Sequence, residues 1–343
     1  MKIIYFITVI ALVNIITLAS CGSETKKPEI KTEANSIAKT PDDLKKINDQ
    51  LLADPNSASL YHKRAKYYLN SKNYNACLED MHRVLKIDST KAEYFLTLSD
   101  LYFVTNQTGN AKTALENCIR IDDKNVDAML KLAELYLYVR KNEQSMKYIN
   151  MALKVNQYNA KAYFMKGMNY KEMRDTAKAI SSMQTAVEQD QQYYNAYIQL
   201  GILCAAKKNT LAIQYYKNAI RIQGNSTEAL YNLGKCYQDM QDWKNAIDTY
   251  TDLVKINADN KNAHYNMGVI YLVNQKKYDL AISHFTEAIK IDSRYVEAYY
   301  GRGISYQSLR DVKHAANDFQ ACLDINPKYE PAIIALKELK GIK

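Results

Sequence analysis

The chain has 343 residues, of which 47% are hydrophobic, so it is long enough to bury a large core. Its formal charge of +9 comes from 46 basic and 37 acidic residues interleaved along the whole chain, which disfavours a nucleic-acid-binding protein, whose cations would cluster on one face. Only 10 glycines and 5 prolines are present, so few residues break helices and the sequence favours helix after helix with short turns.

The first twenty residues have the layout of an export signal. Lys2 is followed by an apolar run from Ile3 to Leu18, which is short for a helix that crosses a membrane. The run leads into the tetrapeptide LASC at 18–21, which resembles the lipobox of bacterial lipoproteins. The resemblance implies a signal peptide over 1–20 and lipidation of Cys21. An uncleaved membrane anchor and a secreted protein with a stray cysteine remain as alternatives.

Residues 21–40 form a polar segment without helical periodicity, which is typical of a flexible tether behind a lipidated cysteine. The next segment, 41–57, begins with Pro41, Asp42 and Asp43, and proline and acidic residues suit the first turn of a helix. This segment is therefore predicted to be an N-terminal capping helix. Its inward-facing side chains are expected to be Ile47, Leu51 and Leu52.

From residue 58 onward the sequence repeats with a period of about 34 residues. Eight units are expected, at 58–91, 92–125, 126–159, 160–193, 194–226, 227–260, 261–295 and 296–329. The unit at 194 lacks one residue and the unit at 261 has one extra, both in or near the turn between two helices, where changes of length are tolerated. Residues 330–343 are predicted to form a C-terminal capping helix, apolar at Ile333, Leu336 and Leu339.

Four positions of each unit carry the same kind of side chain. A small residue lies near the middle of the first expected helix: Ala65, Ser99, Ala133, Gly167, Gly201, Gly234, Gly268 and Gly303. A ring follows three positions later, with Cys204 as the one departure: Tyr68, Tyr102, Tyr136, Tyr170, Tyr237, Tyr271 and Tyr306. A small residue opens the second helix: Cys77, Ala111, Ser145, Ala179, Ala212, Ala246, Ala281 and Ala315. A large apolar residue comes four positions after it: Met81, Leu115, Ile149, Met183, Tyr216, Tyr250, Phe285 and Phe319.

This pattern resembles the tetratricopeptide repeat, a helix-turn-helix unit, over about residues 42–343. The resemblance implies an all-α fold, a right-handed α-solenoid of about eight hairpins with short capping helices. Small residues let two helices approach closely where they cross, and the ring and the large apolar residue fill the space around the crossing. Each hairpin leaves one apolar face exposed, and stacking on the next hairpin covers it. The proline that closes the family's unit is kept only at Pro327, and at Pro55 before the first full unit.

In this family the first helices line a concave groove that holds a partner. The resemblance therefore implies a partner-binding stripe at the fifth residue of each unit, which after His62 consists of Leu96, Leu130, Phe164, Ile198, Tyr231, Tyr265 and Tyr300. Exposed apolar and aromatic patches mark protein-binding sites, and tyrosine is frequent in binding hot spots. The same side chains are equally compatible with a core shared between neighbouring hairpins. The lysine of the family's carboxylate clamp is missing from this position, and only Asn232 and Asn266 match its asparagine ladder.

No catalytic or metal-binding motif is present in the sequence. Apart from Cys21, the five cysteines form no C-x-x-C pair, and four of them occupy core positions, so small buried thiols are expected. The five histidines form no H-E-x-x-H, and there is neither a phosphate-binding loop nor a G-x-S-x-G motif. We therefore expect a protein that is not an enzyme and uses no cofactor, metal, small-molecule substrate or nucleic acid.

The predicted function is a protein–protein interaction scaffold or adaptor, anchored by lipid in a bacterial cell envelope. A structural component that associates with itself is the alternative, and a regulatory or enzyme-associated subunit is a further one. Gly22 stands where the aspartate that retains lipoproteins at the inner membrane would follow Cys21, so the resemblance implies the outer membrane, on either face. A mildly basic surface suits an anionic membrane.

Overall fold

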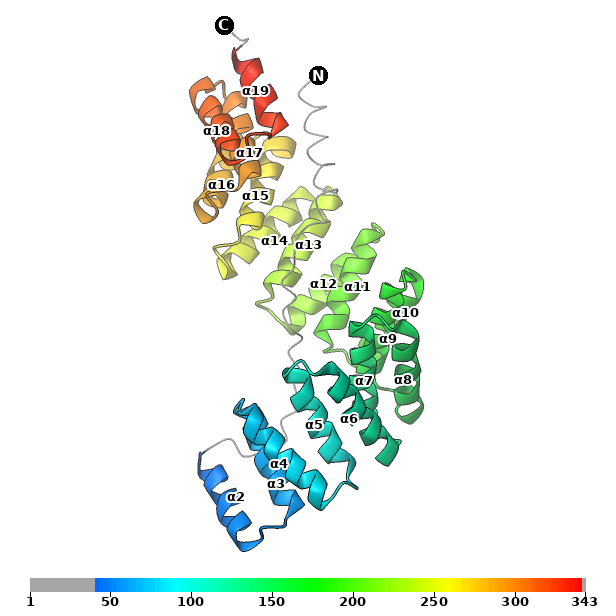
Figure 1. Ribbon diagram of the computed structural model, residues 1–343. Helices are drawn as coiled ribbons and strands as arrows, with labels where there is room; N and C mark the ends of the chain where they lie inside the picture. Colours follow the sequence, from blue (N-terminus) through cyan, green and yellow to red (C-terminus); the bar gives the residue numbers. More distant parts are fainter. Residues whose placement is uncertain (1–40, 341–343) are drawn as a thin grey trace. The chain divides into compact units, whose positions relative to one another are not determined.

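The computed structural model describes residues 41–340, so the expected signal peptide, Cys21 and the tether lie outside the described residues. Within 41–340 the chain contains 18 α-helices, one π-helix and no strand (Figure 1). Both the all-α class and the succession of helical hairpins are therefore confirmed. None of these helices combines the length and the apolarity needed to cross a lipid bilayer.

The helices fall into two compact units, which meet in the sequence at Tyr193 and Tyr194. The N-terminal unit consists of α2 (Pro41–Ala53), α3 (Ala58–Asn70), α4 (Tyr74–Ile87), α5 (Ala92–Val104), α6 (Thr108–Ile121), α7 (Val126–Tyr138), α8 (Asn142–Val155), α9 (Ala160–Glu172) and α10 (Thr176–Gln189). The C-terminal unit consists of α11 (Tyr194–Ala206), α12 (Leu211–Ile222), α13 (Thr227–Asp239), α14 (Trp243–Ile256), α15 (Lys261–Val269), the π-helix η2 (Ile270–Gln275), α16 (Tyr278–Ile291), α17 (Val296–Ser308), α18 (Val312–Ile325) and α19 (Glu330–Lys340). From α3 to α18 the helices pair into eight hairpins, each with a first and a second helix.

Every first helix ends in a turn whose backbone is left-handed at one residue. The φ angles lie between 53° and 62° at Lys72, Asn106, Arg140, Arg174, Lys208, Gln241, Lys276 and Arg310. The N–H of the following residue returns to a carbonyl of the first helix, as from Asn73 to Tyr68 at 2.8 Å, which closes a Schellman motif. Left-handed positions favour glycine, because a Cβ there costs roughly 1–2 kcal/mol, yet none of these eight residues is glycine.

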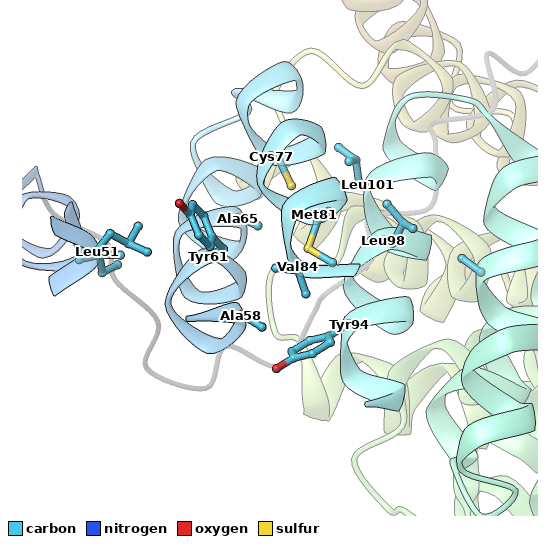
Figure 2. Packing of buried hydrophobic residues seen from close by; sticks show 12 residues of the cluster. Leu51, Ala58, Tyr61, Ala65, Cys77, Met81, Val84, Tyr94, Leu98 and Leu101 are labelled. Carbon is cyan, nitrogen blue, oxygen red and sulfur yellow. The ribbon is translucent and has the colours of Figure 1, made fainter. Parts of the chain in front are cut away.

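Small residues lie where the two helices of a hairpin cross. In the first hairpin Ala65 and Cys77 are completely buried beside Met81 (Figure 2). In later hairpins glycine takes the place of Ala65, and a Cβ added to Gly234 would lie 2.6 Å from the Tyr250 ring. That distance is inside van der Waals contact, so only glycine allows this ring to lie at the crossing. The repeat therefore keeps a small residue at this position because the two helices approach closely there.

The two capping helices cover the ends of their units. Ile47 and Leu51 of α2 are buried against the first hairpin, but Leu52 is 81% exposed, so the expectation that Leu52 faces inward is wrong. Leu52 lies about 100° further around the helix than Leu51, which turns it away from the first hairpin. At the other end Leu339 of α19 is buried and Leu336 packs against the same cluster.

The extra residue of the 261 unit lies within the first helix rather than in the turn. After α15 the helix continues as the π-helix η2, whose hydrogen bonds each enclose one more residue than those of an α-helix. The closing bond of the turn then runs from Lys277 N–H back to Tyr271 at 2.9 Å, across six residues instead of five. In the 194 unit the missing residue shortens the second helix, α12, which starts one residue late at Leu211.

Candidate functional site: the first-helix faces

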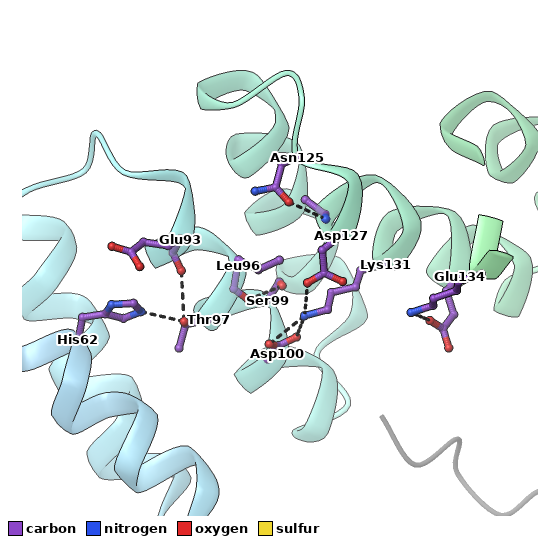
Figure 3. A network of polar contacts seen from close by, with 12 residues as sticks. His62, Glu93, Leu96, Thr97, Ser99, Asp100, Asn125, Asp127, Lys131 and Glu134 are labelled. Carbon is purple, nitrogen blue, oxygen red and sulfur yellow. Dashed lines mark hydrogen bonds and ion pairs between the residues drawn. The ribbon is translucent and has the colours of Figure 1, made fainter. Parts of the chain in front are cut away.

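The surface formed by the first helices of each unit is called here its first-helix face. In the N-terminal unit this face carries polar contacts that join successive first helices (Figure 3). His62 of α3 lies 2.8 Å from the Thr97 hydroxyl of α5, which in turn donates to the Glu93 carbonyl. His62 is only 5% exposed, and burial, helped by the nearby cations of Lys66 and Lys91, lowers its pKa to about 3. His62 is therefore neutral at physiological pH.

The next contact on this face is an ion pair between α5 and α7. Lys131 Nζ lies 2.8 Å from Asp100 Oδ1 and 3.2 Å from Asp127 Oδ2. The side chains of Lys131 and Asp100 are 15% and 18% exposed, so the pair is shielded from most of the solvent. Burial raises the pKa of Asp100 against the opposing effect of Lys131. Burial also tends to lower the pKa of Lys131, but the two carboxylates outweigh it and raise that pKa.

A looser ion pair follows between α7 and α9. Glu134 Oε2 and Lys161 Nζ are 3.9 Å apart, and their side chains are 33% and 47% exposed. A small cleft of about 10 Å³ lies between Glu134 and the Asp100–Lys131 pair, with Phe103 among its lining residues. A space of that size holds about one water molecule. Charged groups on this face are thus tightly paired toward α5 and more accessible toward α9.

In the C-terminal unit, amide groups and a buried tyrosine connect the first helices α13 and α15. Asn266 of α15 donates from Nδ2 to the Tyr250 hydroxyl at 3.0 Å, and that hydroxyl donates to Gln238 Oε1 at 3.1 Å. The Tyr231 ring lies 6.1 Å from the Tyr250 ring, and burial raises the pKa of the Tyr231 phenol. Different groups therefore join the first helices α13 and α15 than join the first helices of the N-terminal unit.

The structure buries most of the predicted groove stripe. Leu130, Ile198, Tyr265 and Tyr300 are at most 8% exposed, as is His62 at the equivalent position. An exposed stripe at these positions is therefore wrong for this structure, and the shared core is the interpretation that fits their burial. The other three predicted groove residues are half-buried: Leu96, Phe164 and Tyr231.

The physical reason is that rings from two sides enclose the fifth residue. Tyr265 lies 5.8 Å from the Phe285 ring of its own second helix and 5.1 Å from Tyr295, which precedes the next first helix. Tyr300 is enclosed in the same way by Phe319 and Tyr329. Sequence reasoning missed a different set of residues on the first-helix face. The ninth residue of each of the first three units is charged, which the alignment of the units would have shown: Lys66, Asp100 and Glu134.

The five cysteines of the described residues are free and buried, which confirms the expectation of small core thiols. Burial raises the pKa of Cys77 and Cys322 to about 12 and that of Cys118 and Cys236 to about 11. These thiols stay protonated at neutral pH, and the thiol form is not the nucleophile.

Two histidines meet beside the π-helix. The Nδ1 atoms of His264 and His284 are 3.4 Å apart, and the Tyr271 ring stacks on His284 at 5.4 Å. Burial lowers the pKa of both imidazoles, and each therefore tends to stay neutral. Within 41–340 no group of three or more His, Cys, Asp or Glu side chains is arranged to hold a metal ion.

Family models place tetratricopeptide repeats along both units. Models described as tetratricopeptide repeat match residues 92–125, 160–193 and 296–329, and another matches 203–268. A model described as TPR repeat matches 272–309. No curated protein sequence matches the chain.

Solved structures of repeat proteins are similar to this chain, and one of them shares its fold. The C-terminal part of a TPR repeat-containing protein from Cytophaga hutchinsonii aligns with a TM-score of 0.62 at 20% identity, over 69% of this chain and 98% of that one. A tetratricopeptide repeat protein from Parabacteroides merdae aligns with a TM-score of 0.48 at 15% identity, over 73% and 98% of the two chains. YrrB, described as a TPR protein with an unusual peptide-binding site, aligns with a TM-score of 0.40 at 20% identity, over 65% and 98%.

Proposed function

Because this chain is built from tetratricopeptide repeats, we propose that it is a non-enzymatic scaffold that binds a protein partner on the first-helix face of its N-terminal unit. Stacked hairpins offer a long surface whose backbone is already satisfied by helical hydrogen bonds, so side chains alone decide what binds. The buried, protonated thiols offer no nucleophile that would favour catalysis instead.

The observation that carries the proposal is the loose Glu134–Lys161 pair. At 3.9 Å and with both side chains partly exposed, this pair gains little from its own attraction. A partner that offers one cation and one anion can replace a weak contact with two charge-assisted hydrogen bonds, which are about twice as strong as neutral ones. The neighbouring Asp100–Lys131 pair is shorter and more buried, so it fixes the position of α7 while Glu134 stays available.

The test exchanges the two charges without removing the pair. The double variant Glu134→Lys/Lys161→Glu keeps an ion pair between α7 and α9 but reverses the polarity that a partner meets. The matched control exchanges a pair on a second helix, Lys112→Glu/Glu116→Lys, whose side chains are 43% and 41% exposed. A partner should be crosslinked and recovered from intact cells with the native chain and the control, and lost with the face variant. Equal recovery with both variants would contradict the proposal.

The proposal includes a lipid anchor at Cys21, in the outer membrane of a bacterial envelope. The support is the sequence alone: an apolar run followed directly by the LASC tetrapeptide and a polar tether. The variant Cys21→Ala should move the protein from the membrane fraction to the soluble fraction, and mass spectrometry should find acyl chains on the native cysteine. A Cys21→Ala protein that stays with the membrane would show that the apolar run itself is the anchor.

A further inference from the structure

The intrahairpin turns of each unit gather at one edge of the stack. The contacts His62–Thr97, Asp100–Lys131 and Glu134–Lys161 join successive first helices, which therefore lie side by side. Each hairpin repeats the same helix-turn-helix order, so these first helices run in the same direction. Their C-terminal ends, and the turns that follow them, therefore lie on the same side. We call this side the turn edge. In the N-terminal unit it consists of residues 71–74, 105–108, 139–142 and 173–176.

The turn edge of the N-terminal unit is cationic. It carries four basic residues against the single acid Asp175: Lys72, Arg140, Lys141 and Arg174. The opposite edge, formed by the junctions between hairpins, has the reverse balance, with Lys91 and Lys124 against five acids: Asp54, Asp88, Asp122, Asp123 and Asp190. The stack is therefore polarised between its two edges.

The cations of this edge are exposed, and none of the four forms an ion pair with another described residue. Three of them, Lys72, Arg140 and Arg174, occupy the left-handed turn position that favours glycine. Lys131 on the first-helix face is, by contrast, held between two carboxylates. Charge at this edge is consequently unneutralised and available to an external anion.

Exposed apolar side chains are interleaved with these cations. Tyr138 is 75% exposed and Val139 is 42% exposed immediately before Arg140, and Met173 is 51% exposed immediately before Arg174. The C-terminal unit repeats the arrangement with Leu309, 44% exposed, before Arg310. Apolar groups beside flexible cations fit a lipid surface, because the apolar groups enter the headgroup region while the cations reach the phosphates.

We propose that the turn edge of the N-terminal unit binds the anionic surface of a lipid bilayer. This inference deepens the proposed function and rests on its membrane anchor, since a tethered chain stays within reach of the bilayer. Cations alone would also fit a nucleic acid, but its phosphate backbone gives the exposed Val139 and Met173 no apolar partner. An acidic protein is the other occupant, and the acidic polymer in the test distinguishes it from lipid. With the turn edge on lipid, the first helices point their C-terminal ends at the membrane. The first-helix face along their length is then not covered by lipid and can bind a partner.

The test measures binding of the full chain, carrying Cys21→Ala, to vesicles of phosphatidylcholine with and without phosphatidylglycerol. The turn-edge variant is Lys72→Asn/Arg140→Asn/Arg174→Asn, which keeps the fold because asparagine accepts the left-handed backbone, as Asn106 does in this chain. Each surface cation contributes about a fivefold gain in membrane affinity, so the triple variant should bind the anionic vesicles about 100-fold more weakly. Residues 1–40 are the same in every protein compared, so their own affinity cancels.

The matched control removes three exposed cations elsewhere on the same unit, Lys91→Asn/Lys124→Asn/Lys154→Gln, and should weaken binding by less than about threefold. The variant Val139→Ser/Met173→Ser should lower the part of the binding that persists at high salt.

An equal loss of affinity for the turn-edge and control variants, or binding that does not depend on phosphatidylglycerol, would overturn the inference. So would tighter binding to an acidic polymer than to the vesicles. Two measurements described above test the proposed function separately. Mass spectrometry of Cys21 tests the lipid anchor, and the Glu134→Lys/Lys161→Glu exchange tests binding of the partner.

Discussion

Arg302 and Asp318 form a two-point ion pair between the helices of the last hairpin, with Nε 2.8 Å from Oδ2 and Nη2 2.7 Å from Oδ1. The same pair occurs at the equivalent positions of the first hairpin, between Arg64 and Asp80, at 2.8 Å and 2.7 Å. In the six hairpins between them, the position of the arginine holds other residues: Leu98, Leu132, Lys166, Leu200, Leu233 and Met267. The pair therefore marks the two hairpins that meet a capping helix.

Removing one partner of the last pair should be strongly destabilising. The side chains of Arg302 and Asp318 are 18% and 7% exposed, so Asp318→Ala leaves a buried guanidinium without its anion. We expect the free energy of unfolding of the C-terminal unit to fall by about 3–5 kcal/mol, measured by urea denaturation. The double variant Arg302→Leu/Asp318→Thr copies the sixth hairpin and should recover most of the loss. A double variant no better than Asp318→Ala would contradict this account.

A methyl group at Gly234 should destabilise its hairpin. Alanine normally stabilises a helix relative to glycine by roughly 0.5–1 kcal/mol, but here the added Cβ would lie 2.6 Å from the Tyr250 ring. We expect Gly234→Ala to lower the free energy of unfolding by about 1–3 kcal/mol through overpacking. The control is Gly109→Ala in α6, where a Cβ meets nothing within 4 Å and the change should be neutral or stabilising. Thermal unfolding of both variants measures the difference in sign.

Acid should weaken the N-terminal unit through His62. Its pKa is about 3 in the folded chain and about 6.5 when unfolded, so the unfolded chain binds one more proton between these values. The contribution is fully present above pH 6.5 and is lost as pH falls, at about 1.4 kcal/mol per pH unit. Urea denaturation from pH 7 to pH 4 should show this slope in the native chain and a shallower one in His62→Gln. Parallel curves would mean that water solvates the imidazole in the folded state.

The π-helix should tolerate the loss of its extra residue. Deleting Asn274, an exposed residue of η2, gives the first helix the length it has in the other hairpins and lets an α-helix replace the wider turns. We expect the free energy of unfolding to change by less than about 1 kcal/mol. Deleting Gln307 from α17 is the control. That first helix has the usual 13 residues, so the deletion would displace the turn at Arg310. Equal losses in the two deletions would contradict the assignment of the extra residue to η2.

The hairpins could be predicted from the sequence because each depends on residues close together in the chain. The crossing of Gly234 with Tyr250 spans 16 residues within one unit, so the pattern that predicts it repeats in full. The position of the inserted residue could not be predicted in this way. Both a longer turn and a π-helix keep Ala281 in the core with Tyr271 packed against it, and only the backbone bond from Lys277 to Tyr271 distinguishes them.

The burial of the predicted partner stripe could not be predicted where it depends on a neighbouring unit. Tyr265 is covered by Tyr295, which lies beyond the end of its own hairpin, and a residue-by-residue comparison of units does not contain that contact. The polar contacts on the first-helix face of the N-terminal unit involve the same difficulty, because Asp100 and Lys131 belong to different units. Cysteine burial was easier to predict, since Cys77 and Cys322 stand in or beside positions that the repeat keeps small or apolar.

The turns close through backbone groups alone: the amide after each left-handed residue bonds to a carbonyl of the first helix, usually that of a tyrosine. The side chain of the left-handed residue takes no part in that bond and lies in solvent. Its identity can therefore drift between related chains while every hairpin keeps its shape. Substitutions at these turns can therefore change the charge of the turn edge without changing the backbone that closes each hairpin.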